Sequence, residues 1–224
     1  MIIDLFRNPQ VYLPIFLMRI PVILIALTIH EISHGYVAYK LGDYTAKITG
    51  RLTLNPIKHL DPMGTVLMLS GLFGWAKPVP VNPRNFKKPK RDMALSALAG
   101  PVSNILLGFI GVFIYMVVLR LFYSQILAGN TFYIALMNFC YVFLSLNIGL
   151  AVFNMIPIPP LDGSRIFLQF LPDKIYFGIM RYERYMMLVL FLLLFTGVLG
   201  SPISYMIQTI INGMIKILSY LPFF

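Results

Sequence analysis

The sequence predicts an all-α polytopic membrane protein with about five or six membrane segments. Hydrophobic residues make up 58% of the chain and charged residues only 12%, whereas a soluble domain is about one quarter charged. The apolar residues form long runs, and most Lys and Arg lie in the short loops between them, which is typical of cytoplasmic loops in membrane proteins. The net charge of +10 therefore indicates contact with membrane lipid and not with nucleic acid.

The first apolar run, residues 11–39, contains the sequence His30-Glu31-Ile32-Ser33-His34. Histidines four apart project from one face of a helix, so both imidazoles can bind one metal ion. The glutamate between them can take a proton from an attacking water, and this spacing is the signature of zinc metallohydrolases. A chance match is expected in only about one of three thousand such chains. Arg19 interrupts the same run, and we expect its side chain to snorkel to the membrane interface and not to face the substrate.

Residues 45–54 follow the first run and alternate between apolar and polar side chains. Alternation with period two predicts a strand or a hairpin, so we expect a small membrane-associated β element after the first helix.

The remaining apolar runs predict further membrane segments. Residues 63–75 are too short to span and predict a re-entrant or interfacial segment, and the basic loop at 77–92 is expected to face the cytoplasm. Residues 93–122 and 131–153 predict two full spans. Two more runs follow at 185–199 and 203–221. The polar stripe of the last run fits either a helix lying in the interface or a span whose stripe faces the bundle.

A third zinc ligand is expected outside this motif, because a catalytic zinc ion usually has three protein ligands. Three prolines between residues 157 and 160 prevent a helix there and predict a buried bend that presents Asp162. If the basic loops face the cytoplasm, Asp162 lies at the same inner level as His34. Asp61 and Asp92 would lie on the same side, so the rigid bend decides in favour of Asp162 as the third ligand. His59 is the alternative.

Four motifs together resemble the site-2 proteases, the intramembrane zinc metalloproteases of peptidase family M50. They are His-Glu-Ile-Ser-His at 30–34, Asn-Pro-Ile-Lys-His-Leu-Asp-Pro-Met-Gly at 55–64, Ala-Gly-Pro-Val-Ser-Asn at 99–104 and Asn-Met-Ile-Pro-Ile-Pro-Pro-Leu-Asp-Gly at 154–163. The resemblance implies a core of three helices and one Zn²⁺ ion held by His30, His34 and Asp162. It also implies that Glu31 is the general base and that Asn154 helps to hold the unwound substrate. The PDZ-like and CBS-like domains of larger relatives are not expected.

The expected organisation is one integral-membrane protease domain over residues 1–224, with its catalytic core at 11–170 and C-terminal helices at 183–221. We expect it to cut single-pass membrane proteins near the cytoplasmic side of a prokaryotic cell membrane, with Glu31 activating the attacking water. Two alternatives are a membrane metal transporter and a catalytically inactive escort of membrane proteins. One edge of the hairpin at 45–54 is expected to pair with the substrate as an added strand, unless the hairpin only plugs the bundle.

Overall fold

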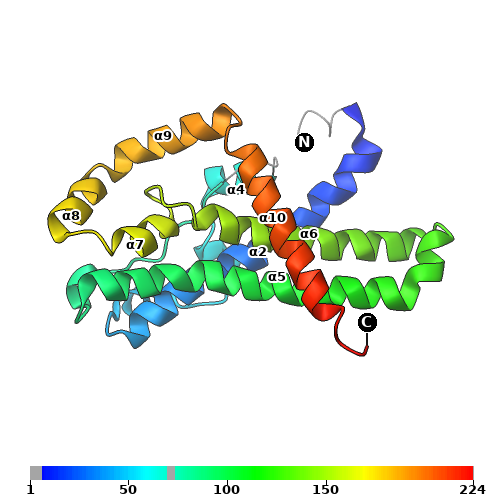
Figure 1. Cartoon of the computed structure of the whole chain (residues 1–224), viewed down its shortest axis with the longest axis horizontal. Helices are drawn as coiled ribbons and strands as arrows, with labels where there is room; N and C mark the ends of the chain where they lie inside the picture. The colour runs from blue at the N-terminus through cyan, green and yellow to red at the C-terminus, as the bar shows by residue number, and fades with distance from the viewer. Residues whose placement is uncertain (1–6, 70–73, 224) are drawn as a thin grey trace.

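The structure is a computed structural model that describes residues 7–69 and 74–223 (Figure 1). Within these ranges the chain is mostly helical, and residues 74–88 form a largely non-helical connection. The helices are α2 (Pro9–Lys40), α3 (Thr45–Ile48), α4 (Pro62–Leu69), α5 (Pro89–Leu127), α6 (Thr131–Asn154), α7 (Asp162–Leu168), α8 (Asp173–Arg181), α9 (Glu183–Phe195) and α10 (Gly200–Leu218), with the 3₁₀ turns η1 (Pro56–Lys58) and η2 (Pro83–Asn85).

Three helices in the described part of the chain, α2, α5 and α6, are long and apolar enough to cross a membrane. They cover the three apolar runs expected to span. The expected five or six membrane segments are not confirmed. α9 has only 13 residues, and a span needs about 20. The run expected at 63–75 forms α4 over its first part, and residues 70–73 lie outside the described ranges.

The expected β element is wrong for residues 45–54. Thr45–Ile48 is a short helix, α3, and the residues after it form turns. The Asp43 carboxylate accepts hydrogen bonds from the backbone N–H and the hydroxyl of Thr45, an Asx-turn contact that favours a turn over an extended chain. Ile48 is 81% exposed and Leu54 is 72% exposed, so the alternating residues build no common apolar face. The expected pairing of a substrate with this stretch therefore loses its structural basis.

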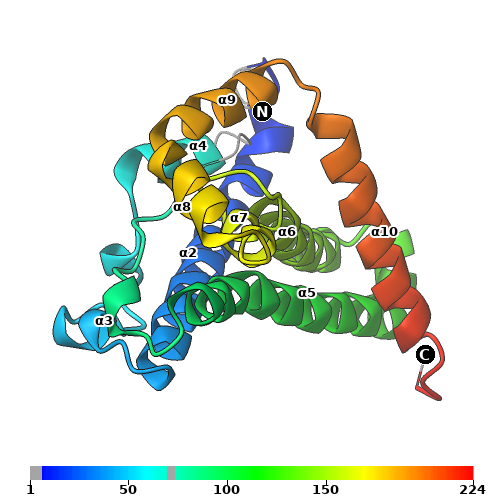
Figure 2. The same ribbon diagram turned by 60° about the vertical axis from the view of Figure 1, so that its left-hand side comes forward.

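α5 and α6 lie antiparallel and side by side in both views (Figures 1 and 2), and α2 packs against both of them. Asn130 begins α6, because its side chain accepts a hydrogen bond from the backbone N–H of Phe132 at 3.1 Å. α10 crosses this pair obliquely (Figure 1) and buries one apolar face against it. That face consists of Ile203, Ile211, Met214 and Leu218.

The polar stripe of α10 faces away from the bundle. Its four residues, Ser204, Gln208, Asn212 and Lys216, are all exposed. The structure therefore does not show the arrangement in which this stripe faces the other helices.

Candidate metal centre

His30 and His34 lie one helical turn apart on α2 and turn their rings toward each other. Their Nε2 atoms are 3.0 Å apart. His34 Nδ1 lies 2.8 Å from the backbone carbonyl oxygen of Ser96 on α5. Because a carbonyl oxygen can only accept, His34 carries its proton on Nδ1 and directs the lone pair of Nε2 into the site. The hydroxyl of Ser96 donates back to the carbonyl of His34 at 3.0 Å, so this contact also joins α2 to α5.

Two buried asparagines fix the tautomer of His30. On α6, the Asn147 amide nitrogen donates to the carbonyl of Phe143 at 2.9 Å, and its Oδ1 accepts from Asn104 Nδ2 on α5 at 3.0 Å. Asn104 Oδ1 is then the atom that faces His30 Nδ1, at 2.6 Å. His30 therefore donates from Nδ1 and also presents an Nε2 lone pair. This chain of amides crosses the three spanning helices.

Asp162 completes the cluster from the start of α7. Its Oδ2 lies 3.2 Å from His30 Nε2 and 3.3 Å from His34 Nε2, and no hydrogen-bond donor in the described residues reaches that buried oxygen.

The three facing atoms fit a tetrahedral zinc ion. Zinc binds histidine nitrogen and carboxylate oxygen at about 2.0–2.2 Å, so tetrahedral ligand atoms are separated by about 3.3 Å. The observed separations of 3.0, 3.2 and 3.3 Å are close to this value. Three lone pairs directed at one point repel each other unless a cation lies between them. The site could therefore hold one zinc ion and leave a fourth position open.

Two glycines allow these groups to meet. A Cβ atom at Gly100 of α5 would lie within 2.6 Å of His30 Cε1 and would also strike the His34 ring. A Cβ atom at Gly163 would lie 2.6 Å from the backbone oxygen of Ile156, which confirms that the bend after α6 leaves no room for a side chain behind Asp162. The α2–α5 contact and the bend therefore both depend on the absence of a side chain.

Glu31 is 7% exposed and is held by the loop between α4 and α5. Its Oε2 accepts a hydrogen bond from the backbone N–H of Val79 at 2.8 Å. The same loop is tied to the end of α2 by Asp43, whose carboxylate accepts from Asn82 N–H and from the Asn85 amide, both at 2.7 Å. These bonds, together with those from Thr45, lower the pKa of Asp43 even though its burial would raise it.

A cavity of about 570 Å³ connects these groups. The residues that line it include His30, Glu31, His34, Asn154 and Asp162. Residues from α9 line the other side, among them Glu183, Met187, Leu190, Phe191 and Leu194. The sequence-predicted site residues therefore share one cavity.

The alternative ligand His59 lies elsewhere. It is fully buried, and its Nε2 lies 2.7 Å from the carbonyl oxygen of Thr53, to which it donates. The cluster of possible metal ligands in the described residues contains His30, His34 and Asp162. His59 instead holds the turns that follow α3. Sequence reasoning missed Asn147, Val79 and Asp43, none of which has a sequence signal that separates it from an ordinary polar or apolar residue.

A bundle of apolar helices that encloses two imidazoles, an aspartate and a glutamate defines a membrane protein with a hydrolase-type metal centre. The chain belongs to Peptidase family M50, whose family model matches residues 18–200. It is therefore a zinc metallopeptidase.

Three curated relatives carry the name "Putative zinc metalloprotease". YwhC of Bacillus subtilis (strain 168) is 48% identical over 192 residues, which cover 85% of this chain and 86% of YwhC. Rip2 of Mycolicibacterium smegmatis is 30% identical over 160 residues, covering 70% of this chain and 58% of Rip2. MJ0611 of Methanocaldococcus jannaschii is 27% identical over 166 residues, covering 72% of this chain and 75% of MJ0611. No solved structure matches the chain.

Proposed function

We propose that this protein is an intramembrane endopeptidase that hydrolyses peptide bonds of single-pass membrane proteins near the cytoplasmic face. The observation that carries the proposal is the triangle of His30, His34 and Asp162 lone-pair atoms beside Glu31, placed in a cavity between apolar helices. His30, His34 and Asp162 are the proposed ligands of one Zn²⁺ ion. Zinc bound there would lower the pKa of a water molecule and polarise the scissile carbonyl.

Glu31 acts as the general base in this proposal. It follows His30 directly in α2, and the Val79 N–H at 2.8 Å holds one of its carboxylate oxygens in place. The carboxylate takes a proton from the attacking water and returns it to the leaving amine nitrogen. General-base catalysis of this kind contributes about 10²- to 10⁴-fold in rate, so Glu31→Gln should lose at least the lower of these factors.

Asn154 is the proposed contact for the substrate backbone. It lies at the last turn of α6 and lines the cavity with the metal cluster. Its amide nitrogen donates to the carbonyl of Leu150 at 3.0 Å, which leaves Oδ1 to accept from a substrate N–H. A substrate helix must unwind before its peptide bond can be attacked, and an acceptor of this kind would stabilise the unwound backbone.

The proposed orientation follows from charge. The loop that leads into α5 and the first turn of α5 together contain six Lys and Arg residues between 77 and 91, and the loop between α5 and α6 (residues 128–130) has no charged residue. Loops rich in Lys and Arg face the cytoplasm, so the end of α2 that carries the metal cluster would face it too. The proposed location is the cell membrane of a prokaryote, as the relatives come from bacteria and an archaeon.

The test is cleavage of a tagged single-pass protein by the purified chain in lipid vesicles. The wild type should cut within or at the cytoplasmic end of the substrate's membrane segment, as mapped by mass spectrometry, and Glu31→Gln should not. Cysteines introduced at Lys88 and Ser124 in a Cys140→Ser background should label from opposite sides of the membrane. Cleavage only of water-soluble peptides would refute the intramembrane substrate, and labelling from one side would refute the orientation.

A further inference from the structure

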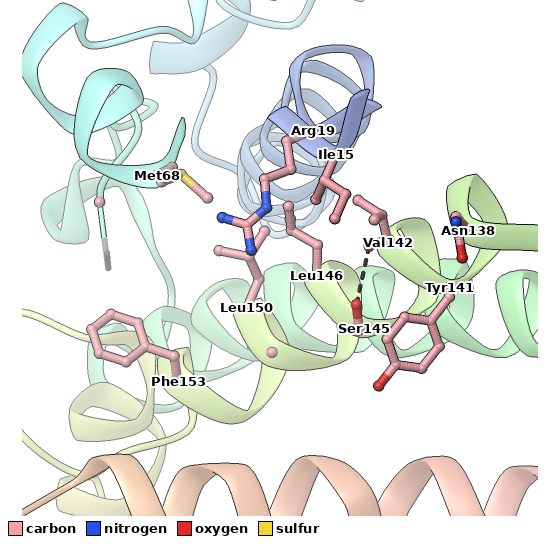
Figure 3. Close-up of a pocket in the computed structure, with 12 residues that line it drawn as sticks. Ile15, Arg19, Met68, Asn138, Tyr141, Val142, Ser145, Leu146, Leu150 and Phe153 are labelled. Carbon is pink, nitrogen blue, oxygen red and sulfur yellow. Dashed lines mark hydrogen bonds between the residues drawn. The ribbon is translucent and has the colours of Figure 1, made fainter. Parts of the chain in front are cut away.

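A second cavity, of about 390 Å³, lies between α2, α4 and α6. Arg19 of α2 lines it, opposite residues of α6 that include Tyr141, Ser145 and Leu150. Figure 3 shows the Arg19 side chain extending between Met68 and the Leu146–Leu150 face of α6. The Arg19 side chain therefore faces a cavity between helices, and its expected snorkelling to the membrane interface stays a prediction.

Arg19 lacks a counter-ion in the described part of the chain. It is half-buried, and residues 7–69 and 74–223 provide it with no hydrogen bond or ion pair. A guanidinium at membrane depth is costly, and such a group pairs with an acceptor or marks a substrate path. The cavity around Arg19 therefore favours a ligand with negative charge.

The Arg19 cavity adjoins the metal cavity. Both are lined by Gly74, Leu150 and Phe153. His30 follows Arg19 by eleven residues in α2, which is about 16 Å along the helix axis. A membrane segment bound at the metal centre can therefore extend along α6 as far as Arg19.

The depth of Arg19 favours a protein segment over a lipid. Arg19 lies ten residues from the start of α2 at Pro9, which is about 15 Å along the helix. If α2 enters the hydrocarbon core, which is about 30 Å thick, at its first turn, Arg19 lies well below the level of the lipid phosphates. An acidic side chain in a transmembrane substrate reaches this depth.

We propose that Arg19 is a specificity-determining residue that binds an Asp or Glu side chain in the membrane segment of the substrate. The 16 Å from His30 corresponds to about 5 substrate residues if they are extended, at about 3.3 Å each, and to about 11 if they are helical. The acidic residue thus lies between 5 and 11 residues from the scissile bond. This inference rests on the proposed function, because it assigns the substrate class of the same site.

The test uses the full chain in neutral-lipid vesicles and a series of single-pass substrates that have one Asp or one Leu at successive positions. The wild type should prefer Asp over Leu at one stretch of this range by about 10- to 100-fold in kcat/KM, as expected for a hydrogen bond to a charged group. Arg19→Leu should abolish the preference and leave bound zinc unchanged. Arg19→Glu should transfer the preference to a substrate with Lys at that position. Arg7→Leu, which removes a cation before the same helix, should behave as the wild type.

A binding measurement separates this inference from the proposed function. In a Glu31→Gln, Cys140→Ser background, Ser145→Cys should form a disulfide with a cysteine next to the substrate Asp, and Arg19→Leu should reduce its yield. Crosslinking without wild-type cleavage would refute the proposed function and would support only the binding of an acidic membrane segment at Arg19. An unchanged yield or preference in Arg19→Leu would overturn the inference. The inference would also be overturned if Arg19→Leu lowered cleavage only in vesicles with anionic lipid and equally for all substrates. Arg19 would then bind a lipid headgroup.

Discussion

Replacing Asn104 by Leu should weaken zinc binding without touching a ligand. The substitution removes the acceptor 2.6 Å from His30 Nδ1 and the donor 3.0 Å from Asn147 Oδ1, both buried. Each buried polar group left without a partner costs about 1–3 kcal/mol, so unfolding should become easier by about 2–6 kcal/mol. Loss of the group that orients a metal-binding histidine typically lowers metal affinity about 10- to 100-fold.

Competition with a chelator of known zinc affinity measures this effect on the purified chain, and thermal unfolding in detergent measures the change in stability. Ser103→Ala is the matched control, since Ser103 is the neighbouring residue of α5 and bonds only to the local carbonyl of Gly100. Asn147→Leu should give a smaller loss of zinc affinity because it acts one hydrogen bond further away. If Asn104→Leu binds zinc as tightly as Ser103→Ala, the asparagines do not orient His30.

Three further results are expected. Gly100→Ala should lower zinc affinity about 5- to 150-fold, because its Cβ would displace the His34 and His30 rings and overpacking costs about 1–3 kcal/mol. Gly178→Ala, whose Cβ meets nothing within 4 Å, should be neutral or stabilising, and an equal effect of both on chelator competition would contradict this reasoning. Asp43 has a lowered pKa in the folded state, so its stabilising effect is present above the unfolded pKa of about 3.9 and is lost as the pH falls. Asp43→Asn should therefore flatten the acid limb of the unfolding curve, and an unchanged limb would refute the assignment. Zinc at about one hundred times its Kd should stabilise the wild type by about 2.7 kcal/mol, a gain that Asp162→Ala should lack in a melting experiment.

The spanning helices could be predicted from the sequence because the bilayer imposes a simple rule on each of them. A run of about 20 apolar residues must be helical there, since no water satisfies its backbone. α2, α5 and α6 meet this rule. The prediction of a β element was wrong because alternation over ten residues is a weak signal, and because the Asp43 carboxylate at Thr45 favours a turn.

The metal cluster was predictable in part. The spacing of His30 and His34 is a property of one helix, so it could be read locally, and the prolines before Asp162 indicated a bend. The partners of these residues are contacts between distant segments. Nothing in the sequence distinguishes Asn147, which extends the hydrogen-bond chain to His30, from an asparagine that faces a neighbouring helix for packing alone. Likewise, Val79 donates to Glu31 from its backbone N–H. Any residue except proline could make this bond, so the residue type does not reveal it.

Zinc content and proteolysis measured on the same purified variants test the central claim most directly. His30→Ala, His34→Ala and Asp162→Ala should each lose the bound zinc ion and the cleavage of a membrane substrate. Glu31→Gln should keep one zinc ion per chain and still lose cleavage, and His59→Ala should keep both. Stoichiometric zinc in Asp162→Ala together with its loss in His59→Ala, or wild-type cleavage by Glu31→Gln, would contradict the proposed centre.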